Sequence, residues 1–294
     1  ETFAWRDMPE EEQLQSFKTA LNWGPTHLCE MGADLSSAVQ SMKSSKDPEA
    51  KIPNDIKASL EATGSGISRL QLVTPPYPIF NWDDVPVKEG LHNRHMVGLM
   101  AWNAFLSRTS LTLHGKRVAV IGYGLVGTGV AETARAFGGA VSVVEKDPSR
   151  ILQAKYAGWE VVSLEEALPK VDVVVTATGA TSVLNEKHFP LLKDGAFLIN
   201  VGHHSKEIDV SALFRHPHQE VLPFVTSVKQ EKSTVYLFAN GAMANLVAGK
   251  GDSLNSFDVI LGVMVAGISH IVGAGSLASP GIHLLPREVW EKAL

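Results

Sequence analysis

The sequence predicts an α/β protein that is built on a doubly wound parallel sheet, with a smaller, truncated helical or α+β portion beside it. Two observations predict this class. Short apolar runs alternate with helical periods from residue 117 onwards, which is the pattern of βαβ units. The first of these runs ends in a glycine-rich turn that leads into a helix. With 294 residues, the chain is long enough for two modest domains.

The part of the chain before residue 110 is predicted to be largely helical. Residues 8–21 place apolar side chains at helical spacing, after acidic residues in the first turn. Four prolines in residues 73–87 predict an extended connector, because proline lacks the amide hydrogen that a helix needs. Residues 91–106 return to a helical pattern.

The middle of the chain alternates between the two kinds of element. Strands are predicted at 117–122, 140–145, 160–162, 172–176 and 196–200, and helices at 126–137, 149–157, 164–168 and 185–191. A dense apolar run at 259–268 predicts a buried helix that is too short to span a bilayer. We therefore expect the smaller portion at 1–110, the doubly wound domain at 111–240, and a helical segment at 241–294 that packs back on the first portion.

Charge and composition argue against several classes of function. The net charge is -5 and no basic block could follow a phosphate backbone, so we expect no nucleic-acid partner. Cys29 is the only cysteine and the first residues lack the pattern of a signal peptide, which favours the cytoplasm. The histidines lack supporting cysteines or an HExxH arrangement, so we expect no metal site. No membrane partner is expected either.

The turn at residues 122–127 has the features of a dinucleotide site. Gly122 permits a tight turn, Gly124 lets the backbone approach a pyrophosphate, and Gly127 allows the helix to pack closely on the strand. Leu125 and Val126 lie at the helix N-terminus, where free amides favour phosphate. This pattern is typical of a Rossmann unit, although a glycine-rich turn without a ligand is the alternative.

The next strand supplies the residue that selects the cofactor. It ends in Glu145, close to the spacing that is expected for an acid on the ribose hydroxyls. A carboxylate there accepts hydrogen bonds from both hydroxyls and repels a 2′-phosphate, which favours NAD. Arg150 follows five residues later and leaves NADP open. Further candidates for the cofactor site lie at the ends of later strands, namely Thr178, Gly179 and Gly202.

These residues belong to longer motifs that follow one family along nearly the whole chain. The motifs are FAWRDMPEEE (3–12), GADL (32–35), ATGSGI (62–67), GKRVAVIGYGLVGTGVA (115–131), VVEKDP (143–148), TATG (176–179), NVGHHSKEID (200–209), GAMANL (241–246) and GIHLLP (281–286). In this order they resemble S-adenosylhomocysteine hydrolase. The resemblance is strongest from residue 115 to residue 210, and the family's N-terminal segment and lysine- and tyrosine-bearing tail have no counterpart.

The resemblance implies an enzyme that keeps NAD bound and acts on a small-molecule nucleoside. In the family the 3′-hydroxyl of an adenine nucleoside is oxidised, which acidifies the 4′-hydrogen and makes elimination of the 5′ group easy. Water then adds and the ketone is reduced, so that no net redox change occurs. The resemblance therefore makes residues 1–110 the substrate-side portion, and it implies a homo-oligomer.

The resemblance also assigns roles to single residues. Lys88 matches the family lysine at the 3′-oxygen, since a desolvated lysine beside a cationic nicotinamide can act as a base. His203 matches the histidine beside the nicotinamide and the sugar, and Asn93 and Asn245 match amides at the nicotinamide end. A solvated loop lysine, a hydrogen-bonded histidine at a strand end and a helix-capping asparagine are the alternatives.

The segment at 63–65 carries the remaining cofactor contacts that the resemblance implies. Thr63 and Ser65 match two members of a family threonine triplet, and glycine stands between them at position 64. The family glutamate before this triplet aligns with Ala62, and Glu61 lies one position away.

Three more acid–base positions depart from the family pattern. Paired aspartates are replaced by Glu30 and Met31, and Glu30 is either a substitute acid or an ordinary surface carboxylate. The aspartate before the matched asparagine is His92, which we retain as a catalytic candidate, and a late family histidine is Asp252.

Four functions remain open at this stage. The leading hypothesis is a redox-neutral nucleoside lyase or dehydratase, because the nicotinamide side is kept while the hydrolytic side is changed. The alternatives are S-adenosylhomocysteine hydrolysis with altered bases, a non-catalytic regulator that responds to NAD, and a simple NAD-dependent dehydrogenase.

Overall fold

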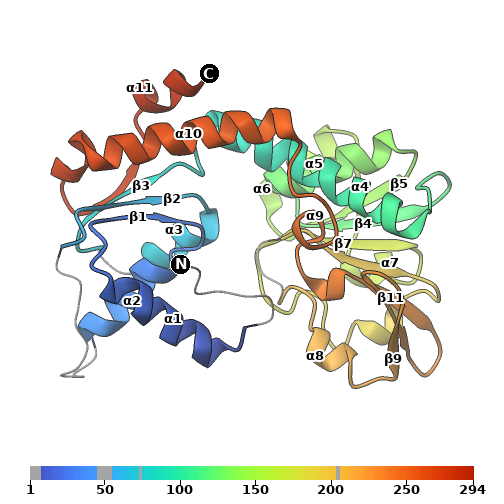
Figure 1. Ribbon diagram of the computed structural model, residues 1–294. Coiled ribbons are helices and arrows are strands. Elements are labelled where there is room, and N and C mark those ends of the chain that lie inside the picture. Colours follow the sequence, from blue (N-terminus) through green and yellow to red (C-terminus); the bar gives the residue numbers. More distant parts are fainter. Residues whose placement is uncertain (1–7, 45–54, 73–74, 203–205) are drawn as a thin grey trace. The chain divides into compact units, whose positions relative to one another are not determined.

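The computed structural model describes residues 8–44, 55–72, 75–202 and 206–294 (Figure 1). The chain divides into two compact units. The first comprises Glu1–Lys88 and Asp258–Leu294, and the second comprises Glu89–Phe257. The boundary thus lies at residue 88 instead of near residue 110, since the helix that was expected to end the first portion packs in the second unit. Predicted His203 lies outside the described residues.

The first unit is built on a four-stranded parallel sheet with the order β1-β2-β3-β12. Its strands are β1 (His27–Glu30), β2 (Ala58–Glu61), β3 (Pro78–Asn81) and β12 (Gly281–Leu284). The register aligns their carboxyl ends, with Glu30 opposite Glu61, Glu61 opposite Asn81, and Asn81 opposite Leu284. The smaller portion is therefore an α/β unit, which is more regular than the expected helical or α+β arrangement.

Helices cover both faces of this sheet. The helices are α1 (Glu10–Asn22), α2 (Asp34–Ser44), α3 (Gly64–Leu70), α10 (Leu254–Val272) and α11 (Arg287–Trp290). Leu60, Phe80 and Trp82 pack with apolar residues of α10 and α11 on one face. Leu28 and Ile79 pack with residues of α1, α2 and α3 on the other. The connector expected at 73–87 contains β3, because the prolines occupy its first position and its flanks.

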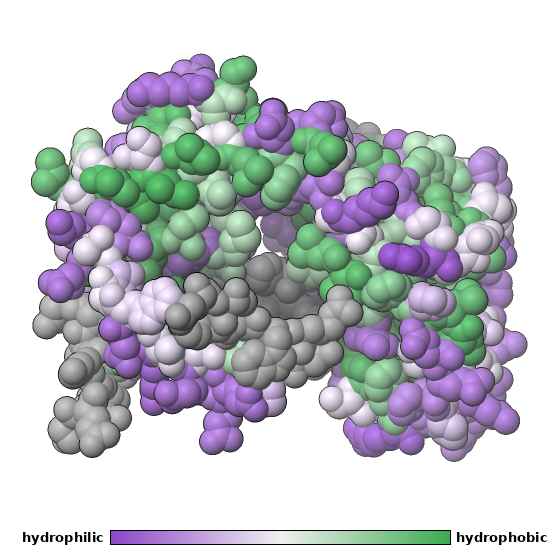
Figure 2. Space-filling view, in the orientation of Figure 1, coloured by the Kyte–Doolittle hydropathy of each residue, from purple (hydrophilic) through white to green (hydrophobic). Residues whose placement is uncertain are grey.

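Helix α10 is longer than the predicted helix at 259–268 and is only partly buried. Ile260, Val263 and Ile271 face the core of the first unit, whereas Val265 is 61% exposed. Figure 2 shows the apolar surface that gathers along this helix. Among the described residues, α10 is the single helix with the length and apolar composition of a membrane span, a test that the core helices of soluble proteins also pass.

The second unit confirms the doubly wound parallel sheet. Its eight strands have the order β6-β5-β4-β7-β8-β11-β10-β9. They are β4 (Arg117–Ile121), β5 (Ala140–Val144), β6 (Glu160–Val161), β7 (Val173–Thr176), β8 (Phe197–Asn200), β9 (His218–Leu222), β10 (Val225–Lys229) and β11 (Thr234–Phe238). Strands β4 to β8 are parallel, β11 is parallel to β8, and β10 and β9 are antiparallel additions that were not predicted.

The helices of the second unit lie on both faces of the sheet. They are the π-helix η1 (Lys88–Met96), which begins at the last residue of the first unit, α4 (Val97–Thr109), α5 (Leu125–Ala136), α6 (Pro148–Tyr156), α7 (Leu164–Ala167), α8 (Val210–Leu213) and α9 (Ala244–Val247), with 3-10 turns η2 (Phe189–Leu191) and η3 (Ala239–Gly241). Only η2 stands in the place of the helix expected at 185–191.

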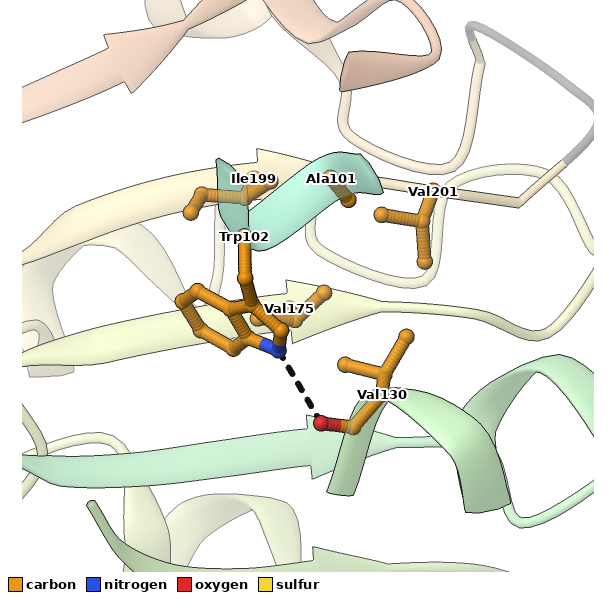
Figure 3. A pocket seen from close by; sticks show the side chains of 6 residues that line it. All are labelled: Ala101, Trp102, Val130, Val175, Ile199 and Val201. Carbon is orange, nitrogen blue, oxygen red and sulfur yellow. Dashed lines mark hydrogen bonds between the residues drawn. The ribbon is translucent and has the colours of Figure 1, made fainter. Parts of the chain in front are cut away.

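Helix α4 belongs to the second unit because its apolar face packs on α5 and the sheet. The indole of Trp102 donates a hydrogen bond to the carbonyl oxygen of Val130, 3.0 Å away (Figure 3). The gap beside it is lined only by apolar side chains, namely Ala101, Trp102, Val130, Val175, Ile199 and Val201. It is a packing gap of the core, and the polar candidate site lies at the carboxyl edge of the sheet.

Candidate functional site

The carboxyl ends of the central strands place the predicted cofactor residues along one edge of the second unit. Ile121 at the end of β4 lies opposite both Val144 of β5 and Thr176 of β7, and Thr176 lies opposite Asn200 of β8. The chain order reverses between β4 and β7, which is where ligands bind in doubly wound sheets. The loops after all four strands therefore meet at the switch point.

The glycine-rich turn has the backbone that a pyrophosphate requires. Gly122 has a φ of 97°, and a Cβ there would stand 2.6 Å from the carbonyl oxygen of Ala177. A Cβ on Gly127 would overlap the carbonyl oxygen of Gly122, so helix α5 approaches the strand more closely than any side chain allows. Gly122 and Gly127 are thus required by the local geometry, as the spacing predicted for these two positions.

The start of helix α5 leaves its first amides available. Gly124 is the N-cap residue in an extended conformation, and no side chain caps the helix. Leu125 is exposed and Val126 half-buried in the first turn. Unpaired amides at a helix N-terminus are a binding site for phosphate groups. The residues present therefore fit the pyrophosphate of a dinucleotide.

Glu145 lies directly after β5, beside this turn. Its carboxylate accepts hydrogen bonds from the amides of Tyr123 at 2.7 Å, Lys146 at 2.7 Å and Asp147 at 3.0 Å. Partial burial acts to raise its pKa, but the three amides and the charge of Arg150 outweigh burial, so the pKa lies below its ordinary value. Glu145 is therefore an ionised acceptor beside the glycine-rich turn, and it could accept hydrogen bonds from the ribose hydroxyls of a dinucleotide.

The loop after β7 is held by Glu207, a residue that sequence reasoning did not select. Its buried carboxylate accepts from the amide and hydroxyl of Thr178 at 3.0 and 2.9 Å, and from the amide of Gly179 at 2.6 Å. A Cβ on Gly202 would overlap the same carboxylate. Thr178, Gly179 and Gly202 are thus brought together, and Glu207 sets their geometry.

Asn200 joins the ends of β7 and β8 to the loop that leads to α9. Its side-chain oxygen accepts from the hydroxyl of Thr176 and from the amide of Gly202, and its amide donates to the carbonyl oxygen of Gly241. The TATG and NVGH patterns contain the signal for this network, because both place polar residues at strand ends.

Two amides that the resemblance places at the nicotinamide end lie in the second unit. Asn245 in α9 is 2% exposed, and its side-chain oxygen has no hydrogen-bond partner among the described residues. Asn93 in η1 has its side-chain oxygen 2.9 Å from Nδ1 of His92. A buried unpaired amide oxygen is costly, and the carboxamide of nicotinamide would supply the missing donor.

Lys88, Thr63 and Ser65 belong to the first unit. The amine of Lys88 is buried and contacts Oδ1 of Asp83 at 3.2 Å. The hydroxyls of Thr63 and Ser65 are 3.2 Å apart. A Cβ on Gly64 would stand 3.1 Å from Oδ2 of Asp83, a tight contact with the end of that side chain.

Glu61 and Glu30, which end strands β2 and β1, face the interior of the first unit. Glu61 is fully buried and accepts from the amides of Gly32, Ala33 and Thr63 and from the hydroxyl of Thr63. Glu30 is 6% exposed, and its carboxyl group contacts Ser36 and Ser59.

The environment of Glu30 favours its neutral form. Burial raises the pKa of this carboxyl, hydrogen bonds from Ser36 and Ser59 act against it, and the charge of Glu61 raises it further, so the pKa lies above its ordinary value. Met31, beside it in sequence, is 66% exposed. The structure thus places Glu30 in a buried hydrogen-bond network of the first unit and not at its surface.

Comparison with known proteins agrees with this geometry. Residues 102–251 match the family model described as S-adenosyl-L-homocysteine hydrolase, NAD binding domain. The S-inosyl-L-homocysteine hydrolase of Methanopyrus kandleri is 30% identical over 98% of this chain and 68% of its own length. The adenosylhomocysteinases of Pyrococcus abyssi and Thermococcus kodakarensis are 31% and 33% identical, each over 98% of this chain and 69% of their own length. The second unit is thus an NAD-binding domain.

Proposed function

Because the chain belongs to the S-adenosyl-L-homocysteine hydrolase family, we propose that it is an NAD-dependent, redox-neutral enzyme that removes the 5′ group of a nucleoside. The proposed sequence is oxidation of the 3′-hydroxyl, abstraction of the 4′-proton, elimination of the 5′ group with that proton, and reduction of the ketone. The net change is the loss of one molecule, such as water or a thiol, from the nucleoside.

The observation that carries the proposal is the unpaired, buried oxygen of Asn245. Met243 forms an isolated parallel bridge with Asn200 at the end of β8. Asn245 comes two residues after Met243 and therefore lies near the carboxyl edge of the sheet. Its position and its missing donor both suit the carboxamide of a nicotinamide. Together with the glycine-rich turn and Glu145, this supports a site for both ends of NAD.

The residues of the chain would divide the chemistry as follows. When bound, NAD supplies reversible removal of a hydride from the 3′-carbon. Lys88 takes the proton of the 3′-hydroxyl, and Asp83 orients the amine through their contact. Asn93 and Asn245 hold the nicotinamide amide. Glu207 holds the loop after β7, which borders the cofactor site.

The changed residues favour elimination over hydrolysis. Ala62 stands where the family pattern has a glutamate, and Met31 stands where it has an aspartate. Neither side chain can transfer a proton, and the neighbouring Glu61 uses both carboxylate oxygens on backbone amides. We therefore propose that addition of water is the weakened step, and that the product keeps the new double bond.

Hydrolysis is the second candidate, and it is favoured by the names of the relatives. Proteins that are 30% to 33% identical along nearly the whole chain are called adenosylhomocysteinase or S-inosyl-L-homocysteine hydrolase. Their names differ in the base, so adenine and hypoxanthine nucleosides are both substrates to test.

The test is to incubate the NAD-loaded protein in deuterated water with adenosine, inosine and their homocysteine thioethers. Transient reduction of the cofactor, deuterium at the 4′-carbon of recovered substrate, and a product that has lost water or thiol and has no hydrogen at that carbon are expected. Product nucleoside with free thiol would establish the hydrolase instead. Full reduction with a stable ketone would mean a dehydrogenase, and an unchanged cofactor with undeuterated nucleosides would overturn the proposal and favour a regulator.

The control variant is Lys88→Met, which keeps an apolar stem of similar length. We expect it to retain NAD, because Lys88 lies in the first unit outside the dinucleotide turn. Cofactor reduction by nucleosides should fall at least about a hundredfold, the usual contribution of a general base. Unchanged reduction in this variant would remove Lys88 from the mechanism.

A further inference from the structure

Two departures from the family pattern meet in the second unit. Nε2 of His92 lies 2.6 Å from Oδ2 of Asp252, and their side chains are 18% and 7% exposed. The family pattern has an aspartate at the first position and a histidine at the second. The two residue types are therefore exchanged between positions that are far apart in sequence and in contact in the structure.

We propose that Asp252 and His92 form one positioning pair, exchanged in place relative to the family, which fixes the side-chain amide of Asn93 at the nicotinamide end of the cofactor site. The other ring nitrogen of His92, Nδ1, lies 2.9 Å from the side-chain oxygen of Asn93. The ring thus connects the carboxylate to the amide. Oδ2 of Asp252 and the side-chain oxygen of Asn93 both accept hydrogen bonds from the ring when it carries a proton on each nitrogen.

The burial of Asp252 argues that the pair has a function. Its second oxygen, Oδ1, is buried and has no hydrogen-bond partner in the described part of the chain. A half-satisfied buried carboxylate is costly, and a charge partner at short distance is what offsets that cost. Arg94, the next cation along η1, pairs instead with Glu132 of α5 at 2.7 Å.

The backbone around the pair links it to both predicted amides. His92 and Asn93 lie in the π-helix η1, and such turns are frequent at functional sites. The loop that carries Asp252 is tied to α9, because the amide of Gly251 donates to the carbonyl oxygen of Asn245 at 3.1 Å. The contact of Asp252 with His92 therefore fixes the position of η1 relative to α9.

This inference accounts for two of the altered acid–base positions by a single exchange. The two residues contact each other in this chain, so these changes do not by themselves indicate that the site has been lost. Asp252 and His92 act through Asn93 and are positioning residues. The inference rests on the proposed function only where turnover of a nucleoside is measured. The effect of the pair on cofactor binding can be measured without turnover.

The test is a charge-exchange cycle with His92→Asp, Asp252→His and the double variant. Each single variant places two like residues together, whereas the double variant restores an Asp–His contact in the family order. We expect each single variant to lose at least about tenfold in NAD affinity, and the double variant to recover to within about threefold of the unchanged protein. Fluorescence of bound reduced cofactor reports the nicotinamide environment and should shift in the singles and return in the double.

Asp252→Asn is the matched variant that keeps the shape of the side chain and removes its charge. It should unfold at a temperature close to that of the unchanged protein and still change the fluorescence of bound reduced cofactor. Recovery in the double variant supports the pair even if no nucleoside is turned over, which would count against the proposed function alone. A double variant no better than the weaker single, or singles that bind NAD normally, would overturn the inference.

Discussion

Glu61 and Glu207 are fully buried carboxylates that organise loops in different units of the molecule. Each accepts hydrogen bonds from a threonine hydroxyl and from backbone amides, and each packs against a glycine, Gly66 or Gly202, where a Cβ would overlap it. Glu207 supports the loop after β7 at the cofactor edge, whereas Glu61 supports the chain around Thr63 in the first unit.

The difference lies in what surrounds the two carboxylates. Glu61 has a second buried acid, Glu30, opposite it on β1, whereas the donors to Glu207 belong to a cofactor loop. A buried carboxylate that accepts from backbone amides and a threonine hydroxyl is therefore part of a ligand-binding edge in one unit and of a buried acidic network in the other. A buried carboxylate is thus not by itself a sign of catalysis.

The largest effects are expected from removing the two carboxylates. Glu61→Ala leaves the amides of Gly32, Ala33 and Thr63 buried without an acceptor, and we expect it to lower the free energy of unfolding by at least about 3 kcal/mol. Glu207→Ala should lower the free energy of unfolding by about 2 kcal/mol or more and also weaken NAD binding. Denaturant unfolding and NAD titration check both, and equal loss of NAD binding in the two variants would contradict the comparison.

A pair of glycine variants separates packing from cofactor contact within the second unit. Gly127→Ala should destabilise the fold by about 1–3 kcal/mol and abolish NAD binding, because its Cβ would overlap the carbonyl oxygen of Gly122. Gly124→Ala should leave thermal unfolding nearly unchanged, since its Cβ would stand 3.5 Å from Arg150, and still weaken NAD binding. Normal NAD affinity in Gly124→Ala would contradict its place at the pyrophosphate.

Glu145→Ala tests the selectivity of the cofactor edge. Loss of the carboxylate removes the acceptor for the ribose hydroxyls and one of the two negative charges near Arg150, the other being Asp147. NAD affinity should fall by about tenfold, the value of one or two hydrogen bonds, and affinity for NADP should rise. Titration with both cofactors measures the ratio, and an unchanged ratio would remove Glu145 from the selection of NAD.

The smallest expected effect is a change in pH dependence for Glu30→Gln. Because the pKa of Glu30 is higher in the folded protein than in the unfolded chain, its contribution to stability is present at low pH and is lost as pH rises through the folded pKa. The variant should lack this loss. Melting temperatures of both proteins, followed from about pH 4 upwards, should diverge in that direction, and parallel curves would contradict it.

The sequence was sufficient for the five parallel strands β4 to β8 of the second unit and for its glycine-rich turn, but not for β9, β10 and β11. Strand β4, the turn and α5 form a continuous local pattern, so the positions of Gly122 and Gly127 follow from spacing alone. Glu207 could not be found in this way, because it reaches Thr178 from 29 residues along the chain. The pairing of His92 with Asp252 is likewise a tertiary contact that no local period records.

The first unit was less accessible to sequence reasoning. Its strands have four residues each. Strand β3 begins with a proline, so its sequence is typical of a connector although it forms a parallel strand. Strand β12 comes from near the end of the chain and pairs with β3 in parallel register. Strands β1 to β3 alternate with α2 and α3, but the whole second unit separates β12 from its partner β3, so no local pattern reveals that pairing.

The pairing of β12 with β3 also sets an order for folding during synthesis. Residues 89–257 form a continuous unit and can complete their sheet as soon as they leave the ribosome. The first unit remains without its last strand and without most of α10 until that whole unit has been made. Until then, the edge of β3 and the apolar face that α10 later covers are open to other chains. The strands that precede the second unit in the chain therefore become protected only after that unit has been made.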